Sequence, residues 1–168
     1  NMPAVSKTVL EEGFGLDVSS GLELKTALEL GANDILFSGP GKTDQELELA
    51  ADHPSAVTIL IDSMGELRRL KTVLKDKNSY MRAGLRLNNN PEGLWRKFGV
   101  SLEEIETCFK YAAGSPHTKL CGLQFHSSWN MDPGKQVNFI RKLGRHLDRL
   151  PSGVLDAIEF VDIGGGYW

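Results

Sequence analysis

The chain has few cysteines, no long apolar run and no surplus of basic residues, and each shortage excludes a class of protein. Cys108 and Cys121 are the only cysteines among 168 residues, too few for a disulfide scaffold or a four-cysteine metal site. No apolar stretch approaches the ~20 residues that cross a bilayer. Nothing in the chain has the basic-then-apolar order of a secretory signal peptide. We therefore expect a cytoplasmic protein with no membrane partner and no bound metal.

The charge balance argues against a nucleic-acid partner. The formal net charge is -3, and the lysines and arginines are scattered along the chain, whereas nucleic-acid binding calls for a basic stripe or patch. The composition, 40% hydrophobic and 24% charged, is typical of a soluble globular protein with a substantial core. We expect a single domain over residues 1–168 and a small molecule as its ligand.

Short apolar runs alternate with amphipathic segments along the chain. The runs begin near residues 14, 34, 56, 80, 120 and 157, and helix signals lie between them, such as Gly31 at a helix end and the capping boxes Thr43 with Glu46 and Ser101 with Glu104. This order predicts parallel β/α units. We expect the strands Val57 to Ile61 and Ile158 to Ile163 to be buried and parallel.

Two architectures accommodate such units, an open doubly wound sheet and a (β/α)8 barrel. Eight units usually need ~250 residues, so the six or so units of this chain leave a barrel open. Its uncovered strand edges would favour association of the chain with itself or with another segment.

The run Val161-Asp162-Ile163-Gly164-Gly165-Gly166 joins an apolar strand to three glycines. Consecutive glycines adopt positive φ readily and turn their N–H groups inward, which forms concave sites for phosphate oxygens. The alternative is a flexible turn without a ligand.

Polar residues gather where the expected strands end. Because the carboxyl ends of parallel strands meet at one edge of the sheet, function is expected there. Each residue also has a structural alternative: Asp62 as a helix cap, Arg86 as the partner of a carboxylate, and His126 as a satisfied core histidine. The residues at the strand ends are Asp17, Ser38, Asp62, Arg86, His126 and Asp162.

Several segments together resemble the fold-type III pyridoxal-phosphate decarboxylases, which include diaminopimelate, ornithine, arginine and carboxynorspermidine decarboxylases. The order and spacing of the segments also match that family. The resemblance implies an alanine-racemase-like (β/α)8 barrel, pyridoxal 5'-phosphate as cofactor, an amino acid as substrate and a homodimer. The segments are Gly15 to Leu24, Leu85 to Leu87, Lys97 to Gly99, Gly122 to His126 and Val161 to Gly166.

The resemblance also implies roles for individual residues. His126 would stack on the pyridine ring, and an imidazole face suits that contact. Asp17 and Glu23 would lie at the Schiff-base end as catalytic carboxylates, and Arg86 would lie near the ring face or hydroxyl of the cofactor. The phosphate would be held by Gly164, Gly165, Gly166 and Ser128.

The chain departs from the family in two respects. Trp129 stands where the family has a phosphate-binding serine, so we expect Ser128, or else Ser127, to replace it. The Schiff-base lysine of the family's first strand has no counterpart before Asp17. We therefore expect part of a decarboxylase barrel that lacks the first and last strands and the C-terminal β domain, and that does not turn over alone. The alternatives are a non-catalytic regulatory or binding homologue and a relative of alanine racemase. The sequence does not identify the amino-acid substrate.

Overall fold

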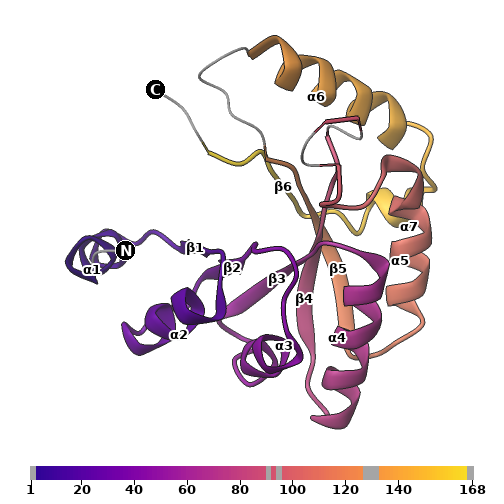
Figure 1. Cartoon of the computed structure of the whole chain (residues 1–168). Helices are drawn as coiled ribbons and strands as arrows, with labels where there is room; N and C mark the ends of the chain where they lie inside the picture. The colour runs from indigo at the N-terminus through magenta and orange to yellow at the C-terminus, as the bar shows by residue number, and fades with distance from the viewer. Residues whose placement is uncertain (1–2, 90–91, 94–95, 127–132, 166–168) are drawn as a thin grey trace.

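The computed structural model describes residues 3–89, 92–93, 96–126 and 133–165. Within these residues, six strands form one sheet in which each strand pairs in parallel with the next along the chain. The sheet curls into a half-barrel (Figure 1), so the prediction of a partial β/α barrel is confirmed. The strands are β1 Leu16–Val18, β2 Ile35–Phe37, β3 Val57–Ile61, β4 Met81–Arg86, β5 Thr118–Gln124 and β6 Phe160–Asp162.

Helices connect the strands, and α2, α3, α4 and α5 each pack against the next along one side of the sheet (Figure 1). Side-chain caps start three of them, because Ser20, Thr43 and Ser63 each accept a hydrogen bond from the backbone N–H three residues later. The helices are α1 Pro3–Glu11, α2 Gly21–Glu29, α3 Asp44–Ala51, α4 Met64–Asp76, α5 Ile105–Ala113, α6 Pro133–Leu147 and α7 Ser152–Leu155, and the 3-10 turn η1 Leu102–Glu104 precedes α5.

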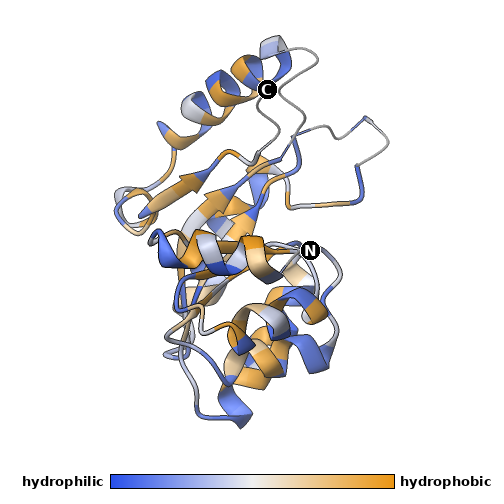
Figure 2. Ribbon diagram, turned by 90° about the vertical axis from the view of Figure 1, so that its left-hand side faces the viewer, coloured by the Kyte–Doolittle hydropathy of each residue, from blue (hydrophilic) through white to orange (hydrophobic). Residues whose placement is uncertain are grey.

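The register divides the strand residues between two faces. Ile59, Ala83 and Phe37 belong to the row that is buried among apolar helix residues such as Leu47 and Leu70. Figure 2 shows the hydrophobic residues concentrated along the strands. The alternate residues point to the concave face, which is the inside of a barrel. The packed helical layer therefore fixes which residues line the concave side.

Several expectations need correction at the level of elements. The strand expected over Ile158 to Ile163 is parallel but not buried: Val161 is 44% exposed and Ile163 is 38% exposed. The reason is that β6 pairs with β5 alone among the described strands. Helices α1 and α7 were not anticipated, and Ser101 starts a 3-10 turn rather than an α-helix directly.

Candidate functional site

Asp17 lies at the end of β1, where four polar side chains come within electrostatic reach of one another. The Ser38 hydroxyl, from the end of β2, donates a hydrogen bond of 2.5 Å to Asp17 Oδ1. Partial desolvation raises the pKa of Asp17; the Ser38 hydrogen bond opposes this shift, Asp162 and Glu23 add to it, and His126 opposes it. The fold therefore brings Asp17, Glu23, His126 and Asp162 together, although they lie far apart in the sequence.

Glu23 is held at the amino end of α2. Its carboxylate accepts a hydrogen bond of 2.7 Å from the backbone N–H of Ser19, while its own N–H donates to the Ser20 hydroxyl. A carboxylate in the first turn of a helix is stabilised by the unpaired N–H groups there. Glu23 is thus oriented by the same turn that starts the helix after Asp17.

Arg86 ends β4 and faces Asp62 at the end of β3. The shortest distance between their charged atoms is 3.5 Å, and the Arg86 guanidinium lies 5.2 Å from the centre of the Phe98 ring. Asp62 Oδ1 also accepts a hydrogen bond of 3.0 Å from Gly99 N. Arg86 therefore pairs with a carboxylate, as the structural alternative predicted. It also remains part of the strand-end cluster.

Asp62 itself is not a helix cap, and that expectation was wrong. The N-cap of α4 is Ser63, whose hydroxyl accepts from Glu66 N at 3.2 Å. Burial raises the pKa of Asp62, against the stabilising effect of Arg86. Asp62 instead links β3, β4 and the Phe98-Gly99 segment at the rim of the half-barrel.

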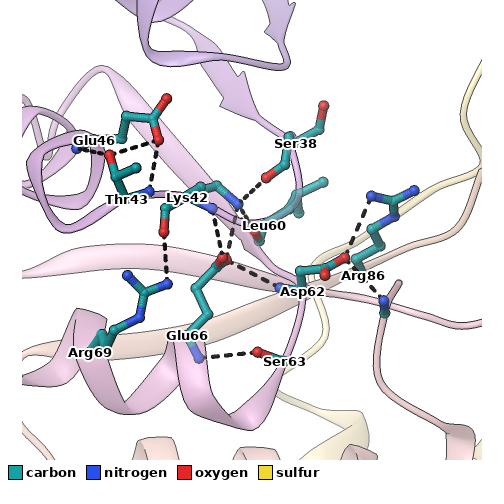
Figure 3. A network of polar contacts seen from close by, with 12 residues as sticks. Ser38, Lys42, Thr43, Glu46, Leu60, Asp62, Ser63, Glu66, Arg69 and Arg86 are labelled. Atoms are coloured by element: carbon teal, nitrogen blue, oxygen red, sulfur yellow. Dashed lines mark hydrogen bonds and ion pairs between the residues drawn. The ribbon is translucent and has the colours of Figure 1, made fainter. Parts of the chain in front are cut away.

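A buried ion pair lies behind this rim (Figure 3). Lys42 Nζ is 3.0 Å from Glu66 Oε1 and donates to the carbonyl oxygens of Gly39 and Leu60. Glu66 in turn accepts from the backbone N–H groups of Lys42 and Asp62. Both side chains are almost completely buried, and burial lowers the pKa of Lys42 while Glu66 opposes that shift. The pair joins the loop after β2, which carries Ser38, to the end of β3, which carries Asp62.

His126 and the glycine run are in contact. His126 follows β5 and is exposed, so the core-histidine alternative was wrong. Gly164 has φ +72°, and a Cβ on it would lie 2.5 Å from His126 Nδ1. Only a glycine therefore allows the imidazole to lie against this backbone. A Cβ on Gly165 would meet no atom of the described residues within 4 Å, so none of these residues fills the space beside its backbone.

Three predicted or competing phosphate ligands, Ser127, Ser128 and Gly166, lie outside the described residues, as does Trp129. Asp162 fixes the start of the glycine run, since its Oδ1 accepts from Gly164 N at 2.8 Å.

Gln124 is a candidate that sequence reasoning missed. It is the Cα partner of Arg86 on one side and of Asp162 on the other, so it lies between two predicted site residues. Gln124 Oε1 and Asp162 Oδ2 are buried and have no hydrogen-bond partner among the described residues. Buried acceptors without donors are uncommon in stable proteins. The sequence feature that could have identified Gln124 is its polar side chain inside the otherwise apolar run Leu120 to Phe125.

A parallel β/α half-barrel with carboxylates, an arginine, a histidine and a glycine run at its strand ends is the arrangement of a β/α-barrel domain with a candidate ligand site at its strand ends. All of residues 1–168 match the family described as pyridoxal-dependent decarboxylase, pyridoxal binding domain. The chain belongs to this family, and its cofactor is pyridoxal 5'-phosphate. The resemblance to pyridoxal-phosphate decarboxylases is thereby confirmed.

Similar proteins are decarboxylases. A 2-[(L-alanin-3-ylcarbamoyl)methyl]-2-hydroxybutanedioate decarboxylase of Staphylococcus aureus is 30% identical over 170 residues, which are 95% of this chain and 42% of that protein. A diaminopimelate decarboxylase of Campylobacter jejuni is 32% identical over 173 residues, 94% of this chain and 41% of that protein. The chain thus spans about two fifths of the length of these curated relatives.

Solved structures share the fold. The diaminopimelate decarboxylase of M. jannaschii, crystallised with L-lysine, has a TM-score of 0.81 at 23% identity, covering 99% of this chain and 42% of that one. This similarity supports the barrel architecture. In the part of the chain that the structure describes, no helix combines the length and apolar character that crossing a membrane demands.

Proposed function

We propose that this chain supplies the pyridoxal-phosphate-binding part of an amino-acid decarboxylase, as a single domain over residues 1–168. The observation that carries the proposal is the contact between His126 and Gly164 at the strand ends, with no described residue filling the space beside Gly165. An aromatic face next to a glycine turn offers a platform for a flat ring and N–H donors for its phosphate. The buried oxygens of Gln124 and Asp162, which have no hydrogen-bond partner among the described residues, provide acceptors at the same strand ends.

The cofactor, when bound, supplies a conjugated ring that accepts the electron pair released when a carboxylate leaves as carbon dioxide. The protein residues orient the reacting groups. Asp17 and Glu23 hold a substrate or protein amine in its charged form, because carboxylates within reach favour the ammonium. Arg86, whose guanidinium is held by Asp62 and Phe98, would lie near the ring face or hydroxyl. Gly165, Gly166 and Ser128 would hold the phosphate with Gly164, whose own N–H donates to Asp162 and which would therefore contribute by shaping the turn. His126 would stack on the ring.

The wider proposal includes an amino-acid substrate, a homodimer and a cytoplasmic location. The relatives named as decarboxylases of amino acids support the first, and two free, buried cysteines agree with a reducing compartment.

A non-catalytic homologue that binds the cofactor is the second candidate. Trp129 in the serine position favours it. Release of carbon dioxide from amino acids by the full-length gene product separates the two candidates: the decarboxylase releases it, and the binding protein does not.

Titration of the chain with pyridoxal phosphate, followed by absorbance and tryptophan fluorescence, tests the site. In the variant Gly165→Val the branched side chain enters open space, so the fold is kept while the anion is blocked. We expect about tenfold weaker binding, equivalent to the loss of one charge-assisted hydrogen bond. His126→Ala is expected to weaken binding as well. Gly144→Val is the matched control, because a Cβ on Gly144 in α6 also meets nothing within 4 Å.

The same titration with pyridoxamine phosphate excludes attachment to surface lysines, since this compound has no aldehyde. Equal binding of pyridoxamine phosphate by wild type, Gly165→Val and His126→Ala would show that the glycine run does not hold the phosphate.

A further inference from the structure

A pocket lies at the opposite end of the sheet from the strand-end site. It has a volume of about 400 Å³ and lies between α4 and the loop that leads from α5 into β5. His117, which directly precedes β5, and Lys75, in the last turn of α4, both line it. Since the strands run in parallel, these residues mark the amino-terminal edge of the sheet. The pocket is therefore separate from the residues proposed to bind the cofactor.

The lining of this pocket is cationic. Arg68, Lys71 and Lys75 line it from one helix, and none of the lining residues is acidic. The spacings of three and four residues place the three cations on one face of α4. Like charges at these spacings repel one another, and such a stripe is usually interrupted by carboxylates. Here the repulsion is uncompensated within the helix face.

Two neighbouring cations, Arg69 and Lys77, differ from the three in the pocket because each pairs with a carboxylate. Arg69, also on α4, pairs with Asp44 at 2.7 Å, and Lys77, the C-cap, pairs with Asp52 at 2.6 Å. Among the described residues, Arg68, Lys71 and Lys75 have no carboxylate within the 4.0 Å of an ion pair. In a chain with a formal net charge of -3, carboxylates are not scarce. This face of α4 therefore offers three cations that no described carboxylate neutralises, side by side in one pocket.

Two residues that line the pocket, Lys71 on α4 and His117 before β5, make contacts of their own. Lys71 Nζ donates to the carbonyl oxygen of Tyr111 at 2.8 Å and lies 3.9 Å from the centre of the Tyr111 ring. His117 Nδ1 is 2.9 Å from the carbonyl oxygen of Ser79. Because a carbonyl oxygen only accepts, Nδ1 carries the hydrogen, and Nε2 is the ring nitrogen left for a ligand or solvent. Lys71 and His117 are thus held in place before any ligand binds.

We propose that this pocket binds a small molecule carrying two phosphate groups. The backbone positions of Arg68 and Lys75 are about 10 Å apart along α4 at 1.5 Å per residue, a spacing that suits two anionic groups better than one. The volume of about 400 Å³ fits one compact ligand. The three α4 cations of this pocket form only a short row, whereas nucleic acid or a membrane surface needs a longer basic track.

Inorganic pyrophosphate is the probe, and binding to the whole chain is measured by calorimetry at constant ionic strength. We expect Arg68→Gln and Lys75→Gln each to weaken binding about threefold to fivefold, the range of partly exposed charge pairs. The double variant Arg68→Glu with Lys75→Glu is expected to weaken it more than about tenfold, because repulsion replaces attraction. Inorganic phosphate and citrate are run beside it to separate a two-phosphate preference from a general preference for anions.

Two controls make the result specific. Arg69→Gln removes the same charge from the same helix, but its guanidinium is directed to Asp44, so binding should be unchanged. Gly165→Val blocks the proposed cofactor phosphate site and should also leave pyrophosphate binding unchanged. The proposal is overturned if wild type does not bind pyrophosphate, if Arg69→Gln weakens binding as much as Arg68→Gln, if citrate binds equally well, or if Gly165→Val abolishes binding.

Discussion

At the scale of single residues, Asp17 is a candidate site residue whose ionised form destabilises the folded chain. Desolvation raises its pKa, with further contributions from Asp162 and Glu23. A folded-state pKa above the unfolded value means that the folded chain binds this proton more tightly. The resulting stabilisation is fully present below the unfolded pKa and is lost as the pH rises through the folded pKa. An ionised Asp17 near neutral pH therefore costs stability.

Asp17→Asn tests this reasoning. Asparagine stays neutral, and its Oδ1 still accepts the hydrogen bond from Ser38. Because Asp17 is exposed and water screens the charges around it, the gain is small, and the variant should unfold at a temperature higher by at most about 1 °C near neutral pH. The difference should disappear below pH 3.8, the ordinary pKa of an aspartate, where the wild-type carboxyl is protonated in both states. Thermal unfolding across this pH range is the measurement. Glu12→Gln is the control, because it removes the same charge at an exposed position. A variant that gains stability equally at all pH values contradicts the argument.

Residue patterns at strand ends predicted most residues of the candidate site, but not the contacts between them. Asp17, Ser38 and His126 were predicted from position alone, because parallel strands end at one edge. The contact of His126 with Gly164 depends on the register of β5 and β6 and on a positive φ, neither of which one sequence states. Gln124 was missed because its amide becomes informative only when Arg86 and Asp162 are its neighbours across the sheet.

At the scale of elements, predictions based on local signals were the accurate ones. The Thr43 capping box of α3 and the glycine end of α2 at Gly31 are both present, because caps depend on residues within one turn. Helix α1 was not anticipated, and none of its residues is buried. The exposure of β6 was also missed, since burial depends on which neighbour a strand finds.

The buried pair Lys42 and Glu66 gives a prediction about how elements are joined. Lys42→Met leaves the Glu66 carboxylate buried without its cation and should lower the free energy of unfolding by about 3–5 kcal/mol. Glu66→Leu should cost a similar amount. The double variant should lose less than the sum of the two, with a coupling energy of about 0.5–3 kcal/mol, because no charge is left uncompensated. Urea unfolding of the four proteins provides the cycle.

Lys77→Met, which breaks the more exposed pair with Asp52, is the control and should cost at most about 1 kcal/mol. Strict additivity of Lys42→Met and Glu66→Leu would contradict the coupling. A cost for Lys42→Met no larger than that for Lys77→Met would show that the pair does not join the β2 loop to β3.

At the scale of the whole molecule, the half-barrel leaves two strand edges without a partner among the described residues, at β1 and β6. Apolar side chains are exposed at the second edge: Val161 on β6 is 44% exposed, and Ile163 directly after the strand is 38% exposed. Unpaired strands and clustered exposed apolar residues favour association. The exposed β6 edge could be buried either in the proposed homodimer or in a simple edge-to-edge association.

We therefore predict that the chain associates in solution through the β6 edge. Light scattering over a range of concentrations should give a mass that rises above the monomer's 18.5 kDa. Val161→Lys places a charge on the edge strand, and burying an unpaired lysine at an interface is costly, so this variant should shift the population towards the monomer. Val5→Lys on α1, where Val5 is 56% exposed, introduces the same charge away from the edge and should associate as wild type does. Circular dichroism of each variant establishes that it is folded. A wild-type chain that stays monomeric at the highest concentration, or a folded Val161→Lys that associates as strongly as wild type, would contradict the prediction, because the β6 edge would then contribute nothing to assembly.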